Sequence, residues 1–318
     1  MKILVLRKKS SKVTWSDSLA LLSEELDAKE GISVNEFLVD INIFKSIYDF
    51  FFNKFLHKKK YDIVICHHAI TFYLSLPLFF FIKSSKRIFL AHEGEVHLGW
   101  KFAVLNNQIL KLGSLLRYSV IWNTFPSNFF SKTFVLSKPQ KKYYKNSEVV
   151  HYLGVNEKVF KSVAANKCNR GLFPSAISRP EKGWNSIPSS LKRMLVYPEN
   201  LKNIEMPQLY SSSEFVIIPS VFETYSLVLI EALLCNAVIF TTKNVGLASD
   251  LLDLYGYDYL VEQGLYVAST HEEMFNLVLK FESSGHEPST RQLAKDSFLT
   301  SSLSANTLLS KITGVLNE

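Results

Sequence analysis

Short apolar runs alternate with helical stretches along this chain, and that order restricts the folds it can adopt. Strand candidates are residues 3–6, 63–66, 87–91, 120–122 and 134–136 in the first half, and 171–175, 215–218 and 237–241 in the second. Strands that alternate with helices predict parallel sheets joined by crossover helices. The 318 residues, 47% of them hydrophobic, suffice for two domains of ordinary size. The sequence therefore predicts an α/β protein.

Residues 215–234, FVIIPSVFETYSLVLIEALL, predict a strand, a loop and a helix with two carboxylates near the loop. The apolar run 215–218 suits a strand buried on both faces, and Pro219 ends it. Thr224 can serve as the N-cap of a helix over residues 225–234.

A polar ligand is expected where this loop meets the helix. The backbone N–H groups of Tyr225, Ser226 and Leu227 would point out of the carboxyl edge of the sheet, where helix N-termini attract phosphate. Glu223 precedes these amides, and Glu231 follows eight positions later. One carboxylate can accept hydrogen bonds from hydroxyls near the phosphate while the other holds a second polyol. A phosphate flanked by two polyols is a nucleotide sugar.

The longer stretch 206–246 resembles the C-terminal domain of the retaining GT-B glycosyltransferases of family four, whose signature is P-S-x-x-E-[GST]-[FY]-[GS]-L-x-x-[LI]-E-A. The positions that match it are Glu223, Thr224, Tyr225, Ser226, Leu227, Glu231 and Ala232. The resemblance implies that Glu223 contacts the donor sugar and that Glu231 binds the ribose hydroxyls. It also implies that the amides of residues 225–227 hold the diphosphate. The alternative is a surface loop followed by a solvated glutamate on a core helix.

Two further segments resemble the same family. In ISRPEKGW, residues 177–184, Lys182 and Gly183 match the loop that neutralises the donor diphosphate. Arg179 is displaced by two positions from the family's arginine, and it either reaches the same phosphate or is a solvated surface residue. In IFLAHEGE, residues 88–95, His92 matches a histidine that borders the donor sugar and the acceptor, or else it is structural.

The resemblance implies the GT-B architecture, in which two Rossmann-like domains face each other across a cleft. We expect an acceptor-side domain over residues 1–154, a nucleotide-sugar-binding domain over 155–300, and a helix over 301–318 that packs back toward the first domain. Two features depart from the family. The loop 7–16 has no glycine, and Lys182 and Glu223 are only 41 positions apart. One β-α unit of the second domain is therefore expected to be missing or reduced.

The implied reaction is transfer of a sugar, with retention at the anomeric carbon, from a nucleotide diphosphate sugar to a glycan or lipid-linked acceptor. UDP-sugar is the favoured donor, cell-surface polysaccharide synthesis is the expected process, and Glu223, Lys182 and His92 are the expected catalytic residues. No metal or other cofactor is expected, because no D-x-D motif occurs. One alternative is a non-catalytic GT-B homologue that binds glycans or acts as a scaffolding subunit. Another is a sugar-nucleotide epimerase of the same architecture.

The net charge of +7 is concentrated in the first half, in clusters at residues 7–12, 54–60, 83–87 and 138–145. Residues 47–60, IYDFFFNKFLHKKK, combine an aromatic stripe with a lysine-rich end. This composition suits a segment that rests on an anionic membrane, or an ordinary amphipathic helix packed on a sheet. Nucleic acid is not an expected partner, because the basic clusters belong to separate elements.

The expected location is cytoplasmic, with peripheral attachment to the inner face of the membrane. No apolar run reaches the length needed to span a bilayer. Cys66, Cys168 and Cys235 are far apart and have neither disulfide-framework nor zinc-site spacing. Two of these cysteines have apolar sequence neighbours that suggest buried thiols.

Overall fold

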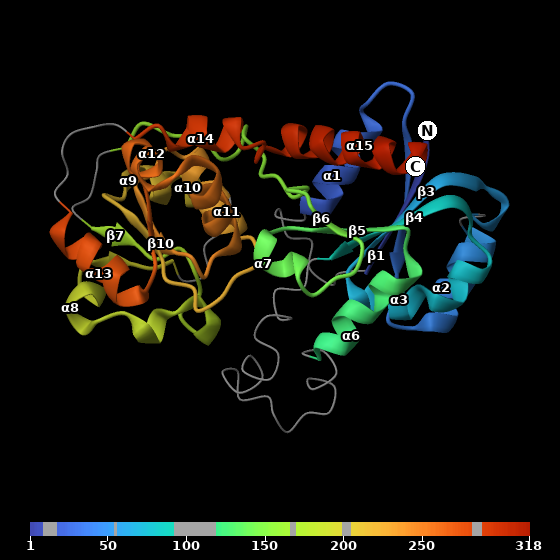
Figure 1. The fold of residues 1–318 in the computed structure, drawn as a ribbon, viewed down its shortest axis with the longest axis horizontal. Helices are drawn as coiled ribbons and strands as arrows, with labels where there is room; N and C mark the ends of the chain where they lie inside the picture. Colours follow the sequence, from blue (N-terminus) through green and yellow to red (C-terminus); the bar gives the residue numbers. More distant parts are fainter. Residues whose placement is uncertain (9–17, 54–55, 92–118, 166–169, 199–204, 282–287) are drawn as a thin grey trace. The chain divides into compact units, whose positions relative to one another are not determined.

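A computed structural model describes residues 1–8, 18–53, 56–91, 119–165, 170–198, 205–281 and 288–318 (Figure 1). These residues divide into two compact units. The first unit contains the described residues up to Leu153 and from Ser304 onward, and the second contains those from Gly154 to Leu303.

The first unit is built on a parallel sheet of six strands in the order β2-β1-β3-β4-β5-β6. The strands are β1 (Lys2–Lys8), β2 (Ser33–Val39), β3 (Lys60–His67), β4 (Lys83–Ala91), β5 (Lys132–Val135) and β6 (Ser147–Val149). Inner strands β1 and β3 pair in parallel, and their apolar residues are almost fully buried. Burial on both faces explains why their sequences are continuous apolar runs rather than alternating ones.

Six helices among the described residues belong wholly or partly to the first unit. They are α1 (Ser18–Asp27), α2 (Ile43–Tyr48), α3 (Ala69–Ser75), α6 (Val120–Thr124), α7 (Lys138–Lys141) and α15 (Ser301–Asn317). Shorter helical segments are the π turn Asp49–Asn53 and the 3₁₀ turns Leu56–Lys58, Leu76–Phe80 and Phe125–Phe129. From Ser304 onward α15 belongs to the first unit, and Lys311 on this helix forms an ion pair with Glu148.

The second unit has a parallel sheet of five strands in the order β11-β10-β9-β7-β8. Its strands are β7 (Gly171–Leu172), β8 (Leu195–Val196), β9 (Val216–Ile218), β10 (Ile239–Thr242) and β11 (Leu265–Ala268). Its helices are α8 (Ser189–Lys192), α9 (Met206–Ser212), α10 (Leu227–Leu234), α11 (Gly246–Tyr255), α12 (Tyr257–Gln263), α13 (His271–Lys280) and α14 (Thr290–Asp296), with 3₁₀ turns at Pro180–Lys182 and Trp184–Ser186. Strand β9 lies in the middle of this sheet and is wholly buried. The loop that follows it begins at the carboxyl edge of the sheet.

The predicted α/β fold with two parallel sheets is confirmed, but the strand predicted at residues 120–122 is wrong. These residues form α6, because the Ser119 hydroxyl caps the helix by accepting a hydrogen bond from the Trp122 N–H at 3.4 Å. The Tyr73 ring stacks on Trp122 with centroids 3.7 Å apart. A cap and a tertiary contact thus outweigh the β-propensity of Val120 and Ile121.

Strands β2, β6, β8 and β11 were not among the strands expected from the sequence. Strand β2 reads SVNEFLV, with polar residues in its middle, and β6 and β8 contain only three and two residues. Short or polar strands of this kind carry little periodic signal. Between Lys182 and Glu223 the chain forms α8, the two-residue edge strand β8 and α9, so a β-α unit is present where one was expected to be missing or reduced.

Two buried thiols were expected, and Cys66 and Cys235 are buried, whereas Cys168 lies outside the described residues. In segment 47–60, Phe50 and Leu56 belong to the core of the first unit. Among the described residues, no helix combines the length and apolar character required to cross a membrane.

Candidate functional site

The loop after β9 holds Glu223 by its backbone on both sides. Its N–H donates to the Asn244 carbonyl at 3.0 Å, and its own carbonyl accepts from the Gly246 N–H at 2.7 Å. These two bonds form a short parallel bridge with Val245, in the loop that follows β10. Because the loop after the neighbouring strand β10 supplies both bonds, Glu223 is held at the carboxyl edge of the sheet, where parallel α/β sheets bind ligands.

Lys182 and Glu223 meet although they are 41 positions apart in the sequence. The Lys182 ammonium donates to Glu223 Oε1 at 2.7 Å, and the Ser220 hydroxyl donates to Oε2 at 3.0 Å. The Lys182 and Glu223 side chains are mostly buried. Partial exclusion of water strengthens the attraction between them relative to an exposed ion pair.

Gly183 allows the Lys182 turn to lie directly on the end of β9. Gly183 has φ +81°, and a Cβ at this position would lie 1.8 Å from the Pro219 carbonyl oxygen. The Val221 N–H also donates to the Glu181 carbonyl at 2.9 Å. The absence of a side chain at Gly183 is therefore what brings the lysine turn to Glu223.

Helix α10 begins at Leu227, and the expectation that Thr224 caps it is wrong. The N-cap is Ser226, whose backbone has φ +81° and whose hydroxyl accepts a hydrogen bond from the Leu229 N–H at 3.3 Å. The helical amides that lack an intrahelical carbonyl are accordingly those of Leu227 to Leu229, and the last of these is occupied by the cap. This set shares Leu227 with the expected amides of residues 225–227.

Glu231 lies inside α10 and is almost fully buried. The Tyr210 hydroxyl, on α9, donates to Glu231 Oε2 at 2.9 Å. Burial raises the pKa of Glu231 to about 7, nearby Glu223 adds to the rise, and the Tyr210 hydrogen bond and Lys182 oppose it. Burial also raises the pKa of the Tyr210 phenol well above its usual value, so the shared proton stays on the tyrosine. One Glu231 oxygen is thus occupied by Tyr210.

Arg179 forms its ion pair with Glu181. Its side chain is 58% exposed and pairs with Glu181 Oε1 at 2.6 Å. Glu181 is buried, and its Oε2 atom lacks a hydrogen-bond partner within the described part of the chain. This neighbouring carboxylate already neutralises the Arg179 guanidinium.

The remaining predicted site residues fall into two groups. Thr224 and Tyr225 are buried, and burial followed by nearby Asp250 raises the pKa of the Tyr225 phenol well above its usual value. The Thr224 hydroxyl is likewise buried and makes no hydrogen bond to the described residues. His92 lies outside the described residues. The structure therefore brings together Lys182, Glu223 and the start of α10, with Glu231 further along the helix.

Sequence reasoning missed Tyr210, Ser220 and His271 as neighbours of this site. Ser220 follows the strand-ending Pro219, a position that could have indicated it. His271 lies with Nε2 3.4 Å from the Ser220 carbonyl oxygen, and its ring stacks on Phe275. No local pattern marks Tyr210 or His271, because each contacts the site from a different helix.

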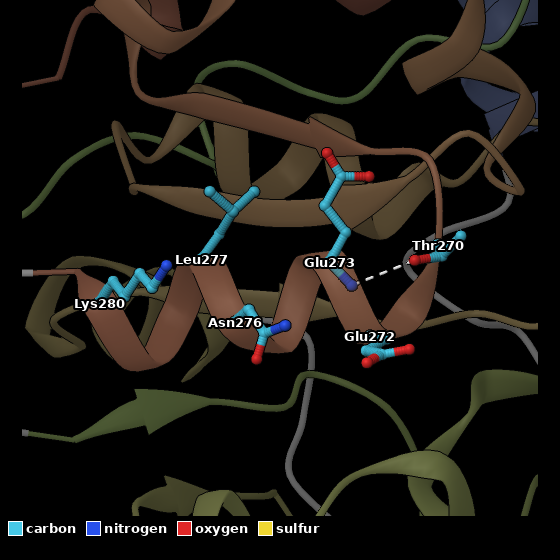
Figure 2. A pocket seen from close by; sticks show the side chains of 6 residues that line it. All are labelled: Thr270, Glu272, Glu273, Asn276, Leu277 and Lys280. Carbon is cyan, nitrogen blue, oxygen red and sulfur yellow. Dashed lines mark hydrogen bonds between the residues drawn. The ribbon is translucent and has the colours of Figure 1, made fainter.

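A separate hollow of about 350 Å³ runs along α13, lined by Thr270, Glu272, Glu273, Asn276, Leu277 and Lys280 (Figure 2). The Thr270 hydroxyl accepts a hydrogen bond from the Glu273 N–H at 3.1 Å and caps this helix. Two glutamates and one lysine make its lining a poor match for a diphosphate. In the described ranges, no group of three or more His, Cys, Asp or Glu side chains could hold a metal ion.

The arrangement around Glu223 suits a ligand with both negative charge and hydroxyls. Lys182 and the first amides of α10 can attract phosphate oxygens. Ionised carboxylates at Glu223 and Glu231 can accept hydrogen bonds from hydroxyl groups.

Solved structures with the same fold cover nearly the whole chain. Sucrose-phosphate synthase from Thermosynechococcus elongatus has 12% identity and a TM-score of 0.67, with 99% of each chain covered. HepE from Anabaena in complex with UDP and glucose has 15% identity and a TM-score of 0.65, covering 99% of this chain and 100% of that one. AviGT4, a glycosyltransferase involved in avilamycin A biosynthesis, has 12% identity and a TM-score of 0.59, with 99% and 98% covered.

Neither a family model nor a curated protein matches the sequence. At identities this low the likeness concerns the fold. The two parallel-sheet units and the near-complete coverage lead to one conclusion: the chain has the two-domain α/β architecture of the GT-B glycosyltransferases.

Proposed function

We propose that this protein transfers a sugar from a nucleotide diphosphate sugar to a hydroxyl acceptor, with retention at the anomeric carbon. The observation that supports this most is the Lys182–Glu223 pair at the carboxyl edge of β9, directly ahead of α10. It combines a cation for phosphate with a carboxylate for sugar hydroxyls.

In this proposal the donor diphosphate competes with Glu223 for the Lys182 ammonium. Lys182 and the amides at the start of α10 then stabilise the negative charge that develops on the leaving nucleotide diphosphate. Glu223, released from the lysine, accepts hydrogen bonds from the donor sugar, and the Glu231 oxygen that Tyr210 does not occupy binds the ribose. No metal is required, because Lys182 supplies the positive charge.

Arg179 and His92 have secondary roles in this proposal. Arg179 is exposed and paired with Glu181, so it would need to exchange that carboxylate for phosphate. His92 is proposed to border the donor sugar and the acceptor on the basis of the sequence resemblance alone.

UDP-sugar is the preferred candidate donor, because HepE, a structural neighbour, was crystallised with UDP-glucose. The proposed acceptor is a glycan or lipid-linked sugar in cell-surface polysaccharide synthesis. The proposed location is the cytoplasmic face of a membrane.

The decisive experiment measures binding and turnover of UDP-, GDP- and ADP-sugars by isothermal titration and by release of nucleotide diphosphate. Lys182→Ala and Glu231→Ala are each expected to weaken donor binding at least about tenfold, the loss of one charge-assisted contact. Lys295→Ala and Glu262→Ala change exposed residues of the same unit and serve as matched controls.

Each other outcome has a distinct meaning. Absence of binding to all donors would contradict the proposal. Glycan binding without turnover would support a non-catalytic homologue, and an isomerised donor without transfer would support an epimerase.

A further inference from the structure

A row of exposed aromatic side chains follows α2 and the π turn after it. Phe44, Tyr48 and Phe52 are four positions apart and therefore lie on one helical face. Phe44 is 84% exposed and Phe52 63%, and the Tyr48 and Phe52 rings stack with centroids 5.1 Å apart. Phe50 occupies the inner face, where it is fully buried and contacts Phe37 edge to face. Phe50 therefore fills the core on this side, and the outer aromatic row does not contribute to it.

A second segment extends this apolar area. Phe80 is 85% exposed and Phe81 is also exposed, at the end of the 3₁₀ turn that precedes β4. The Phe51 and Phe81 rings meet edge to face with centroids 4.8 Å apart, so the two segments are neighbours. We call Phe44, Tyr48, Phe52, Phe80 and Phe81 the aromatic surface.

Exposed lysines border the aromatic surface. Lys83 follows Phe81 by two positions and pairs in register with Lys60 across β3 and β4. Lys58 and Lys59 precede Lys60, and all four side chains are exposed.

The acidic residues beside this surface do not balance its lysines. Asp40 is paired with Lys45 at 3.7 Å, and Asp49 is only partly exposed. Residues 40–53, 58–62 and 76–83 together contain five lysines and three aspartates, the third being Asp62, so their charge balance is positive.

We propose that the aromatic surface rests on an anionic phospholipid bilayer. Exposed apolar side chains that gather on neighbouring segments mark sites that contact a protein or a membrane, so the aromatic surface calls for a partner. Aromatic rings favour the interfacial zone of a bilayer, and neighbouring lysines are attracted to anionic headgroups. The positively charged lysines beside the rings suit an anionic membrane better than a second copy of this chain, which also has a positive net charge. No residue of the donor site belongs to this surface, so the inference is independent of the proposed reaction.

Vesicle co-sedimentation tests this proposal with the full chain. Wild type is expected to pellet with vesicles of 70% phosphatidylcholine and 30% phosphatidylglycerol and to be released by salt. The double change Phe44→Ser and Phe80→Ser is expected to reduce the partition coefficient at least about tenfold, since each ring buries apolar area in the interface. Lys60→Glu is expected to reduce it about fivefold or more, because the lysine charge is both lost and reversed.

Matched control variants distinguish binding through this surface from nonspecific adsorption to vesicles. Leu254→Ser removes an exposed apolar side chain of the second unit, and Lys295→Glu reverses an exposed charge there. Neither is expected to alter vesicle binding. Equal losses in the control variants, or no binding of wild type to anionic vesicles, would overturn the proposal. A dimer in light scattering that dissociates with Phe44→Ser and Phe80→Ser would instead identify the surface as a contact between copies. Thermal melts of each variant confirm that folding is retained.

Discussion

At the scale of single residues, the burial of Glu231 carries an energetic cost. Its pKa of about 7 lies above the ordinary carboxyl value of 4.5, so folding favours the protonated form. The contribution of Glu231 to the free energy of unfolding is therefore fully present below pH 4.5, and it is lost as the pH rises through 7. The difference corresponds to about 3 kcal/mol at pH 8, as an order of magnitude.

Glu231→Gln should remove this pH-dependent cost while keeping an oxygen that can accept from Tyr210. The variant is expected to melt at a higher temperature than wild type at pH 8 and at a similar temperature at pH 5. Calorimetric Tm values between pH 5 and pH 8 provide the check. Equal pH slopes for the two proteins would show that Glu231 ionises freely in the folded state.

Tyr210→Phe should shift the pH dependence of donor binding. The Tyr210 hydrogen bond lowers the pKa of Glu231, so its removal should raise the pH at which the carboxylate becomes available to the ribose. Donor affinity measured from pH 6 to pH 9 is expected to move its midpoint upward. Tyr197→Phe, at an exposed tyrosine of the same unit, serves as the control. An unchanged midpoint with uniformly weaker affinity would indicate a packing role for Tyr210.

At the scale of elements, the site depends on two backbone turns with positive φ. Gly183→Ala places a methyl group against the Pro219 carbonyl and forces alanine into the left-handed region. We expect a loss of at least about 2 kcal/mol in unfolding free energy and loss of donor binding, because Lys182 moves with its turn. Gly314→Ala, in α15 where no atom lies within 4 Å of the added Cβ, is the control. A stable variant with normal donor binding would contradict this account.

Ser226 lies in the second such turn, and two substitutions separate its role as helix cap from the effect of its positive φ. Ser226→Ala removes the cap of α10 and retains the strain of φ +81°, and it should cost about 1–2 kcal/mol. Ser226→Gly also removes the cap but tolerates the backbone angle, so it should cost only a few tenths of a kcal/mol. Urea denaturation of both variants measures the difference. Equal losses would mean that the hydroxyl, and not the backbone angle, carries the effect.

At the scale of the whole molecule, the end of the chain returns to the first unit. Ala305, Leu308 and Ile312 of α15 are fully buried. The other residues of the first unit end at Leu153. In the sequence, α15 therefore follows the second unit, although its buried side chains belong to the first. We propose that the chain is organised as domains 1–154 and 155–300, followed by a helix over 301–318 that packs back on the first domain.

Leu308→Ala should lower the unfolding free energy of the first unit by about 2–5 kcal/mol through a buried cavity. Leu309→Ala, at a partly exposed neighbour, should cost less. Hydrogen exchange resolved by segment is expected to show faster exchange in β1 and β3 of Leu308→Ala, with the second unit unchanged. A uniform change across both units would contradict this assignment.

Features that depend on residues close together in the sequence could be predicted from the sequence alone. Apolar runs bounded by proline or polar residues marked most inner strands of both sheets, and the stretch 215–234 marked the loop that carries Glu223. Asn236 follows α10 with φ +59°, a left-handed conformation that asparagine tolerates. The edge strands β6 and β8 escaped notice because two or three residues have no period to detect.

Only the tertiary structure decided which side chains meet. The Lys182–Glu223 pair depends on Gly183 lying against Pro219, and the state of Glu231 depends on Tyr210 from another helix. The capping residue of α10 and the helical state of residues 120–122 were likewise settled by backbone angles and contacts. Periodicity and turn chemistry act over a few residues and can be read along the chain. Ion pairing, burial and pKa depend on neighbours brought close by folding, which no local pattern encodes.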